Sequence, residues 1–592
     1  MKRLEITEIY SADFETRGGE RAIEEQKTWV WAWAICKIQN FEEVTTGNNI
    51  ASFIKNISSP GNKIIYFHNL KFDGFFIMDY LMKNGFKHVT TRKIGIKQFS
   101  ILMDGQKKLY QIKVRFSQRC LIQFRDSYKK IPSSVDSIAR DFKTKYQKTL
   151  IDYTLDRPED YVMTPEEVEY ISNDVRIVAE ALYSLYKEGY DGLTIGSDAL
   201  RVYKQIFGDT KQNKKFRTIF PILERKEDSF VRKAYRGGWT YCRPDRVGVH
   251  ERVYHYDVCS LYPSNMTSYK YNVGGEEKQN KYPYSHGIYF KGQYDKEKYG
   301  YKYPLYIQHF KAIFILKEGY LPTIQLKGNF MFGASEYVTD SLGEQELYLT
   351  NIDMELFFEH YDVLAIEYID GYCYRAASGF FDEYIEHFIE IKNTSVGAKR
   401  QIAKLFLNNL YGKFATSIQT DCVVPVLDTE RNKLVFVTES QAERAPVYVP
   451  VGVFITAYSR RFTIMTAQQN YENFIYSDTD SLFLTKPLIG GEIHGKKLYT
   501  WSDECAKEKN GYYEKIIFVG AKRYAKLSCG RWKIVCAGMG KDAVEKFLKN
   551  VEDGTMNMND FKIGLKLKDC NLKAKTVDGG VLLVPNGFEL KG

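Results

Sequence analysis

Two aspartates, Asp478 and Asp480, lie at a predicted hairpin tip between the apolar runs 473–476 and 482–485. Side chains alternate along extended chain, so residues two apart project to the same side. Two carboxylates that face one way repel each other unless a hard cation binds between them. A second acidic strand end, Asp257, follows the apolar run 253–256. Together these segments predict a site where two metal ions catalyse nucleotidyl transfer.

A second acidic group is predicted near the N-terminus. Asp13 and Glu15 end a strand-like run, Asp73 follows another, and Tyr170 and Asp174 are four apart on one face of a predicted helix. With 74 acids in 592 residues, acid-x-acid pairs should arise about nine times by chance, so Asp13 and Glu15 alone are typical of a solvated strand end. Their order within one α/β unit instead favours four carboxylates that bind two ions and generate hydroxide.

A basic helix face is predicted between these acidic strands. Arg400, Lys404, Asn408 and Tyr411 are spaced by four, four and three residues, so they share one stripe of a helix. The segment 391–414 has cations and no acid. Such a stripe could bind a triphosphate and stack a ring on its base. A solvated basic face is the alternative, and the absence of balancing acids favours binding.

Elements that position these residues follow from hydrophobic patterning. Strand-like and helical segments alternate over residues 1–195, which indicates an α/β domain. The segment 265–340 is rich in Tyr, Lys and Gly and predicts an inserted subdomain of short strands. A helical block is predicted over 380–414, and a hairpin with a charged tip over 416–444. The expected strands are 9–14, 29–38 and 63–67, and the expected helices 72–83 and 165–187.

Composition bounds the class of protein. A chain of 592 residues with 44% hydrophobic and 27% charged residues should form two or more globular domains. A net charge of +10 with 45 Tyr and 37 Phe suits a nucleic-acid groove, although a Tyr-rich core explains the aromatics equally well. The ten cysteines form no CxxC pair and predict reduced thiols. Because no signal peptide or span of roughly 20 apolar residues is found, a soluble intracellular protein is expected.

Two other motif classes were weighed. Residues 538–543 read GxGxxA after a strand-like run, but a dinucleotide-binding unit needs a further strand and a full sheet, for which too little chain remains. No GxxxxGK[ST] segment exists, which argues against a P-loop ATPase.

The acidic and basic segments resemble, in collinear order, the motifs of family B DNA polymerases. The segments around Asp13, 68–73 and 170–174 resemble their 3′–5′ exonuclease motifs. Segments 257–263, 404–412 and 476–481 resemble the first palm, fingers and second palm motifs, and Lys522-Arg523-Tyr524 matches their Lys-x-Tyr. With Tyr235-Arg236-Gly237-Gly238, the short length and a long insert after the first palm motif, the chain is most similar to the protein-primed polymerases of small tailed bacteriophages.

This resemblance implies a mixed α/β (α+β) fold with a ribonuclease-H-like exonuclease domain and a right-hand polymerase domain that carries two inserts. The implied divisions are exonuclease 1–195, palm 196–268 and 449–547, first insert 269–379, fingers 380–414, second insert 415–448 and thumb 548–592. The first insert would contact a terminal protein, and the second would close a ring over DNA.

The resemblance also implies roles for individual residues. The implied palm metal ligands are Asp257, Val258 and Asp480, with Asp478 as an auxiliary acid; the implied exonuclease ligands are Asp13, Glu15, Asp73 and Asp174, assisted by Tyr170 and Lys148. The implied nucleotide-binding residues are Tyr262, which would exclude a 2′-hydroxyl, Lys392, Arg400, Lys404, Asn408 and Tyr411. The implied DNA-binding residues are Tyr66, His68, Asn69, Phe72, Ser127, Tyr235, Gly237, Gly238, Ser260, Thr456, Arg460, Lys522 and Tyr524.

Some of these residues keep an alternative, and some segments depart from the family pattern. His68 could equally be a packed histidine, and Phe72 a core residue. Tyr128 and Ser133 replace the Leu and Phe usual in relatives, and the segment 489–513 matches poorly, so no role is assigned there.

The expected function is DNA-directed DNA synthesis on a linear phage genome, with protein-primed initiation, processive strand displacement and 3′–5′ proofreading. Two Mg²⁺ ions are expected per active site, with Mn²⁺ as an alternative. The expected partners are template/primer DNA, dNTPs and a terminal protein, with the chain monomeric or heterodimeric with that protein, away from membranes and in the cytoplasm of the infected host. A conventional oligonucleotide-primed polymerase, and a nuclease whose C-terminal half only binds DNA, remain alternatives.

Overall fold

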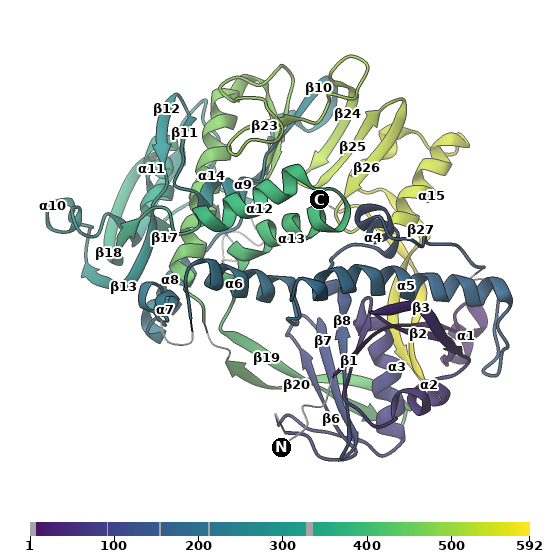
Figure 1. Ribbon diagram of the computed structural model, residues 1–592. Coiled ribbons are helices and arrows are strands. Elements are labelled where there is room, and N and C mark those ends of the chain that lie inside the picture. The colour runs from purple at the N-terminus through teal and green to yellow at the C-terminus, as the bar shows by residue number, and fades with distance from the viewer. Residues whose placement is uncertain are drawn as a thin grey trace.

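The computed structural model describes residues 7–91, 93–152, 155–210, 214–326, 336–443 and 446–591. Residues 1–5, on which part of the signal-peptide expectation rests, and Arg444, the end of the predicted hairpin segment, lie outside these ranges. Figure 1 shows the long helix α5 (Pro165–Lys187) between an N-terminal sheet and the helix α13 (Gly397–Phe414), with the second sheet beyond.

The N-terminal sheet has the order β3-β2-β1-β4-β8-β7-β6-β5. The strands β3 (Asn40–Gly47), β2 (Val30–Lys37) and β1 (Glu8–Thr16) are antiparallel, and β4 (Lys63–Phe67) and β8 (Cys120–Asp126) continue parallel to β1. This is the expected ribonuclease-H-like arrangement. The sheet is completed by β7 (Leu109–Ser117), β6 (Gln98–Met103) and β5 (Lys87–His88).

Helices cover both faces of this sheet, and β4 is therefore buried on both sides. Ile65 and Phe67 pack with α3 (Leu70–Lys83) and α2 (Ile50–Ile57), whereas Ile64 and Tyr66 pack with α5. The predicted helix 165–187 is α5 itself, since Thr164 caps it and forms a reciprocal capping box with Glu167. Each of the five predicted segments of this domain is thereby confirmed, with α3 starting two residues earlier than expected.

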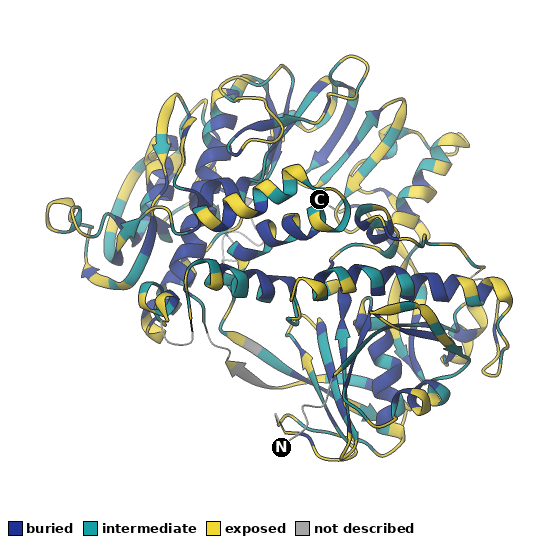
Figure 2. Cartoon of the chain, viewed as in Figure 1, coloured by how far each residue is buried: buried dark blue, intermediate teal, exposed yellow. Residues whose placement is uncertain are grey.

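The second sheet is built around β10 (Gly248–Val258). Its order is β26-β25-β24-β10-β22-β21-β9, and β23 (Trp501–Asp503) also pairs with β10. The helix α14 (Val449–Gln469) packs against this sheet and is buried along most of its length (Figure 2). The other strands are β9 (Thr240–Cys242), β21 (Phe474–Asp478), β22 (Ser481–Leu484), β24 (Tyr513–Gly520), β25 (Arg523–Ser528) and β26 (Arg531–Cys536).

The predicted helical block is two helices that pack on each other, α12 (Asp382–Thr394) and α13. Gly397, at φ +58°, makes the turn between them, a conformation that glycine adopts without a steric penalty. One face of α13 is buried through Ile402, Phe406 and Leu410, which leaves the basic stripe on the opposite side.

The expectation of short strands over 265–340 is confirmed only in part, because strands of two to four residues lie there beside two much longer ones. The sheet of the first insert, β13-β18-β14-β17, includes the 12-residue β14 (Leu305–Leu316) and the 17-residue β18 (Tyr361–Ala377). Tyrosines occupy both buried and half-exposed positions of these strands, which hides the alternation that marks a strand. The other elements are β13 (Tyr282–Lys291), β17 (Gln345–Thr350), α11 (Asn351–His360) and the short hairpin β11 (Lys270–Val273) and β12 (Glu276–Gln279).

Two long hairpins reach back to the N-terminal domain. One is the predicted hairpin, β19 (Gln419–Asp428) and β20 (Lys433–Glu443). The other is β27 (Lys566–Val577) and β28 (Gly580–Glu589), which follows α15 (Lys541–Glu552); the implied thumb boundary at 548 therefore cuts through a helix. Asp578, at the second tip, accepts hydrogen bonds from Lys83 Nζ (2.6 Å) and Asn432 Nδ2 (2.9 Å), which joins both tips to α3.

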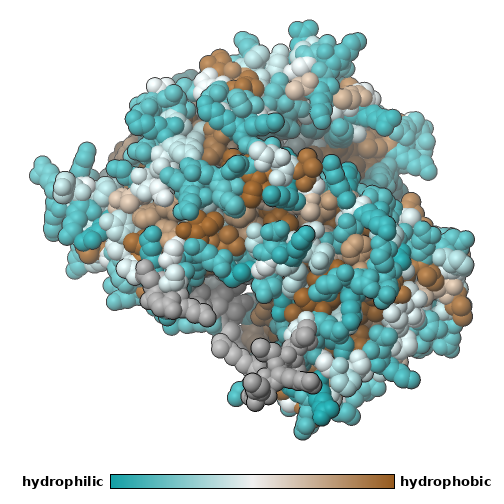
Figure 3. All heavy atoms as spheres, in the orientation of Figure 1, coloured by the Kyte–Doolittle hydropathy of each residue, from teal (hydrophilic) through white to brown (hydrophobic). Residues whose placement is uncertain are grey.

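The visible face in Figure 3 is mostly hydrophilic, with hydrophobic residues in scattered groups. Within the described ranges, no helix has both the length and the hydropathy that crossing a lipid bilayer requires.

Candidate functional site

The paired acids of the second sheet lie where β10, β21 and β22 end side by side. Asp257 is opposite Ser481 in the antiparallel register, and Val258 N donates to Asp480 O at 2.7 Å. The tip residue Thr479 is at φ +63°, and its N donates to Trp239 O at 2.8 Å. A Cβ on Gly238 would lie 2.4 Å from Thr479 Cγ2, so glycine is needed there for the tip to approach.

Burial and mutual repulsion oppose ionisation of both acids. Burial, followed by the charges of Asp480 and Glu504, raises the pKa of Asp257 to about 8. Burial, with a contribution from Asp478, raises the pKa of Asp480 to about 6. Adjacent carboxylates held in this state suit a hard divalent cation, whose charge favours the ionised forms.

A cavity of about 800 Å³ opens above these acids. The rings of Tyr262 and Tyr411 stack across it with centroids 4.0 Å apart, and Lys392 Nζ donates to Ser260 Oγ at 2.8 Å. The cavity therefore joins the acidic strands to the basic stripe. Ten residues with an expected role line it: Asp257, Val258, Ser260, Tyr262, Lys392, Arg400, Lys404, Asn408, Tyr411 and Asp480.

Asp478 has a different environment from Asp480. Both of its carboxylate oxygens accept from Lys522 Nζ at 2.9 Å, and Thr240 Oγ1 donates to it at 3.0 Å. It does not line the cavity. The carboxylate of Asp478 is therefore occupied by Lys522 and Thr240. Tyr524 packs on Tyr476, with ring centroids 5.8 Å apart.

The N-terminal acids also come together, from three elements. Asp13 and Glu15 lie on β1, Asp73 on α3 and Asp174 on α5. Burial, then repulsion from Asp174, raises the pKa of Asp13 to about 7, and burial followed by the charge of Asp13 raises those of Glu15 and Asp73. The pKa of each of Asp13, Glu15 and Asp73 is therefore raised by at least one neighbouring carboxylate of the cluster.

Lys148 closes this cluster on one side. Its Nζ pairs with Asp174 Oδ2 and lies 3.1 Å from the Tyr170 hydroxyl. Asp174 Oδ1 is buried and finds no hydrogen-bond partner in the described part of the chain. A bound cation would supply the partner that this oxygen lacks. Across the described ranges, no three His, Cys, Asp or Glu side chains are already arranged to hold a metal ion.

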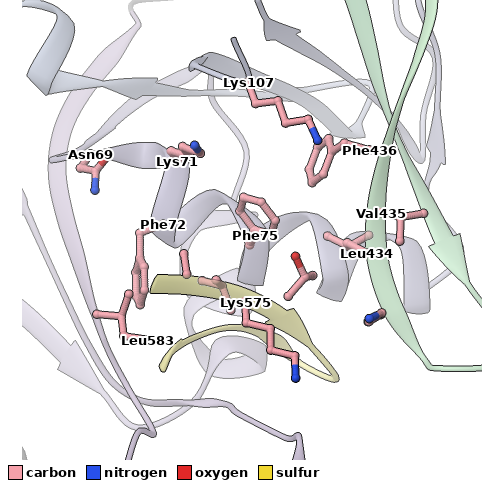
Figure 4. A pocket seen from close by; sticks show the side chains of 14 residues that line it. Asn69, Lys71, Phe72, Phe75, Lys107, Leu434, Val435, Phe436, Lys575 and Leu583 are labelled. Carbon is pink, nitrogen blue, oxygen red and sulfur yellow. The ribbon is translucent and has the colours of Figure 1, made fainter. Parts of the chain in front are cut away.

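A second cavity, of about 610 Å³, lies between α3, β20 and the C-terminal hairpin. Figure 4 shows Phe72 and Leu583 on one side of it and Lys107 and Phe436 on the other. Phe72 is thus partly packed and partly in the cavity wall, and Asn69 also lines it. Four lysines surround the aromatic rings: Lys71, Lys107, Lys433 and Lys575.

Four residues expected to touch DNA are buried in the structure. Tyr66 and Ser127 are 0% exposed, Thr456 is 1% and Arg460 is 3% exposed. Arg460 forms a bidentate pair with Asp353, both Oδ atoms at 2.8 Å, and donates to the carbonyls of Arg236 and Gly237. Arg460 thereby positions the Tyr235–Gly238 loop. The space around Gly237 in this loop is open, since a Cβ there would meet no atom within 4 Å.

The structure favours the packed reading of His68. Its two ring nitrogens lie 2.9 Å from Ser127 Oγ and 2.7 Å from Ser133 O, and burial lowers its pKa. Asp126, which the sequence did not single out, accepts from Asn69 N (3.0 Å) and Tyr128 N (2.9 Å) and so shapes the cavity rim. An aspartate at the end of a strand was the available signal.

Glu504 is the other residue missed. It lines the first cavity with Ser502, because β23 pairs with the strand that carries Asp257. Both lie in the segment to which no role had been assigned.

A sheet with two aspartates at its centre, covered by a basic helix, defines a nucleotidyltransferase of the polymerase class. The family model described as DNA polymerase type B, organellar and viral, matches residues 54–159 and 151–489. The DNA polymerase of Bacillus phage phi29 is 38% identical over 605 residues, covering 98% of this chain and 99% of that protein. That of Streptococcus phage Cp-1 is 31% identical, covering 99% of each.

A solved structure gives the same result. Phi29 DNA polymerase complexed with primer-template DNA and incoming nucleotide substrates has a TM-score of 0.86 at 35% identity, covering 99% of this chain and 100% of that chain. The chain belongs to the type B DNA polymerases of organelles and viruses, and it is a DNA-directed DNA polymerase. The alternative of a nuclease with a non-catalytic C-terminal half is thereby wrong.

Proposed function

We propose that the 800 Å³ cavity is the site of DNA synthesis and that Asp257, Asp480 and the Val258 carbonyl hold two Mg²⁺ ions there. Bound ions would activate the primer hydroxyl and offset phosphate charge. The observation that carries this proposal is the meeting of paired, pKa-raised acids with four cations in one cavity. Lys392, Arg400 and Lys404 neutralise the triphosphate, and the stacked Tyr262 and Tyr411 hold the base and sugar.

The N-terminal cluster acts as the 3′–5′ exonuclease. Asp13, Glu15, Asp73 and Asp174 supply hard oxygen ligands, and Lys148 with Tyr170 orients the attacking water. A frayed single strand reaches them through the cavity of Figure 4, where lysines contact phosphates and Phe72 stacks on a base. Duplex DNA is too wide for such a cavity, so proofreading acts on melted primer ends.

The two hairpins close a ring around the DNA. Their tips meet at Asp578, and the C-terminal tip is bound to the N-terminal domain through Thr28 N and Asp578 O at 2.9 Å. A closed path of this kind supports processive, strand-displacing synthesis without a separate clamp. The divisions proposed from the sequence are kept, with the C-terminal unit beginning at α15.

Initiation uses a protein primer in the infected host cell. The relatives of matching length come from bacteriophages, and the first insert is a complete four-stranded unit at one side of the palm, suited to a protein partner. A conventional oligonucleotide-primed start is the second candidate.

One experiment separates these two starts. The polymerase is incubated with radiolabelled dATP, a divalent ion and the small protein encoded beside it. We expect dAMP linked to a Ser, Thr or Tyr hydroxyl of that protein, and no adduct with the Asp257→Ala variant. If wild type extends an annealed oligonucleotide but never labels the protein, initiation is oligonucleotide-primed.

A further inference from the structure

The segment 489–503 forms a loop clamped to the catalytic strand. His494 N and Gly495 N both donate to Trp501 O, at 3.0 and 3.1 Å, and Trp501 N donates to Glu492 O at 2.8 Å. Trp501 is 0% exposed and lies opposite Val258 in the β10–β23 register. The backbone on either side of the loop is therefore fixed relative to Asp257, as a preorganised binding group requires.

Two neighbouring lysines in this loop differ in their surroundings. Lys497 Nζ pairs with both carboxylate oxygens of Glu492, at 3.0 and 3.3 Å. Lys496 forms no ion pair and no side-chain hydrogen bond with any residue in the described ranges, and it lines the synthesis cavity. Gly495, at φ +78°, turns the chain immediately before it.

The position of Lys496 complements the cations already assigned. Lys392, Arg400 and Lys404 all come from α12 and α13, on one wall of the cavity. On the loop side, Lys496 is the one cation among the described lining residues, beside the acid Glu504. Without Lys496, a triphosphate bound by the helix cations and the proposed metal ions would meet no protein cation among the described lining residues on the loop side of its β- and γ-phosphates.

A neighbouring cavity meets the first one at this lysine. It has a volume of about 570 Å³, is lined by Tyr269, Tyr271 and Trp501, and shares Lys496 and Asn393 with the synthesis cavity. Lys496 thus lies at the junction of the site with a second space large enough for a small phosphate compound.

We propose that Lys496 is a phosphate-binding residue of the synthesis site, contacting the β- and γ-phosphates of the incoming nucleotide and the pyrophosphate released from it. This inference rests on the proposed synthesis site. It adds a contact from the palm side to those from the helices, and it places pyrophosphate departure toward the neighbouring cavity. The binding is the same in both directions of the reaction, so pyrophosphorolysis must depend on it too.

The test compares Lys496→Ala with Lys509→Ala, an exposed lysine of the same region that lines neither cavity. Single-nucleotide incorporation and pyrophosphorolysis are measured on one primer-template over a range of dNTP and pyrophosphate concentrations. For Lys496→Ala we expect the KM for dNTP and for pyrophosphate each to rise about tenfold, which corresponds to ~1.4 kcal/mol, with kcat within about twofold. Lys509→Ala should match wild type, and Lys496→Arg should recover most of the loss.

Degradation of a single strand reports folding independently, and Lys496→Gln replaces the alanine variant if that activity is lost. Unchanged KM values in the folded Lys496 variants would overturn the inference and leave the synthesis site standing. Continued synthesis by Asp480→Ala, assayed in parallel, would instead overturn the site itself.

Discussion

At the scale of single residues, position in the hairpin separates two aspartates that the sequence presents as equivalent. Asp480 opens into the cavity and keeps a raised pKa, whereas Asp478 is occupied by Lys522 and Thr240. The division of roles is therefore set by the partners that each carboxylate meets. By the same reasoning, the metal-free fold disfavours the ionised form of Asp257.

The pH dependence of the free energy of unfolding tests whether the fold disfavours the ionised form of Asp257. The pKa of Asp257 is raised from its ordinary 3.8 to about 8, so the folded chain holds this proton more tightly than the unfolded chain. Stability then falls as pH rises from about 4 to about 8, because the unfolded state ionises first. With metal removed by chelator, Asp257→Asn should melt at a higher temperature than wild type at pH 8 and at the same temperature at pH 4.

The measurement is calorimetry or dye-monitored melting at both pH values. Addition of Mg²⁺ should raise the melting temperature of wild type by more than that of the variant, which keeps only the N-terminal acidic cluster intact. A wild type that melts no lower than Asp257→Asn at pH 8 without metal would contradict the assigned pKa.

At the scale of elements, the two hairpin tips depend on a close backbone approach. Gly579 is at φ +86°, and a Cβ there would lie 2.0 Å from Thr28 O. Because a backbone oxygen cannot swing aside, Gly579→Ala should push the tip off the N-terminal domain at a cost of about 1–3 kcal/mol. We expect shorter products after one binding event, with the rate of single-nucleotide addition retained.

Primer extension in the presence of a DNA trap measures the length of the product made in one binding event. Gly530→Ala is the matched control, since Gly530 has φ +72° in a turn but no atom within 4 Å of its Cβ position. Full-length products from Gly579→Ala under the trap would show that tip docking does not hold the DNA.

The elements that the sequence predicted well are those whose signals are local. Helix α5 was found to the residue because Thr164, Pro165 and Glu167 mark its start and its apolar face repeats along the chain. The acids of both clusters were found by their spacing and order. The loop 489–503 was missed, since its placement depends on Trp501 pairing with a strand more than 200 residues earlier.

Long-range partners also explain why some residues with an expected DNA contact are buried. Nothing local to Arg460 indicates that Asp353, 107 residues away, would bury its guanidinium. Tyr66 likewise reads as an exposed strand end until its hydroxyl is seen 2.9 Å from that of Tyr186. Burial of polar groups is set by tertiary contacts, which a motif does not contain.

At the scale of the whole molecule, one chain carries two acidic sites on two different sheets. The first is bounded by β1, α3 and α5, and the second by β10, β21 and β22, so neither shares a carboxylate with the other. The account therefore requires that each reaction can be removed while the other remains. It also requires that a primer end move between them through the ring formed by the hairpins.

The most direct test is a primer with a 3′ mismatch, incubated with template, dNTPs and Mg²⁺ and followed on a sequencing gel. Wild type should trim the mismatch and then extend. Asp480→Ala should trim the mismatch without extending the primer. The double variant Asp13→Ala with Glu15→Ala should leave the mismatch in every extended product. The activity that each of these variants retains should be reduced by less than about threefold relative to wild type. Loss of both activities in either variant, or trimming by the double variant, would contradict two separate sites.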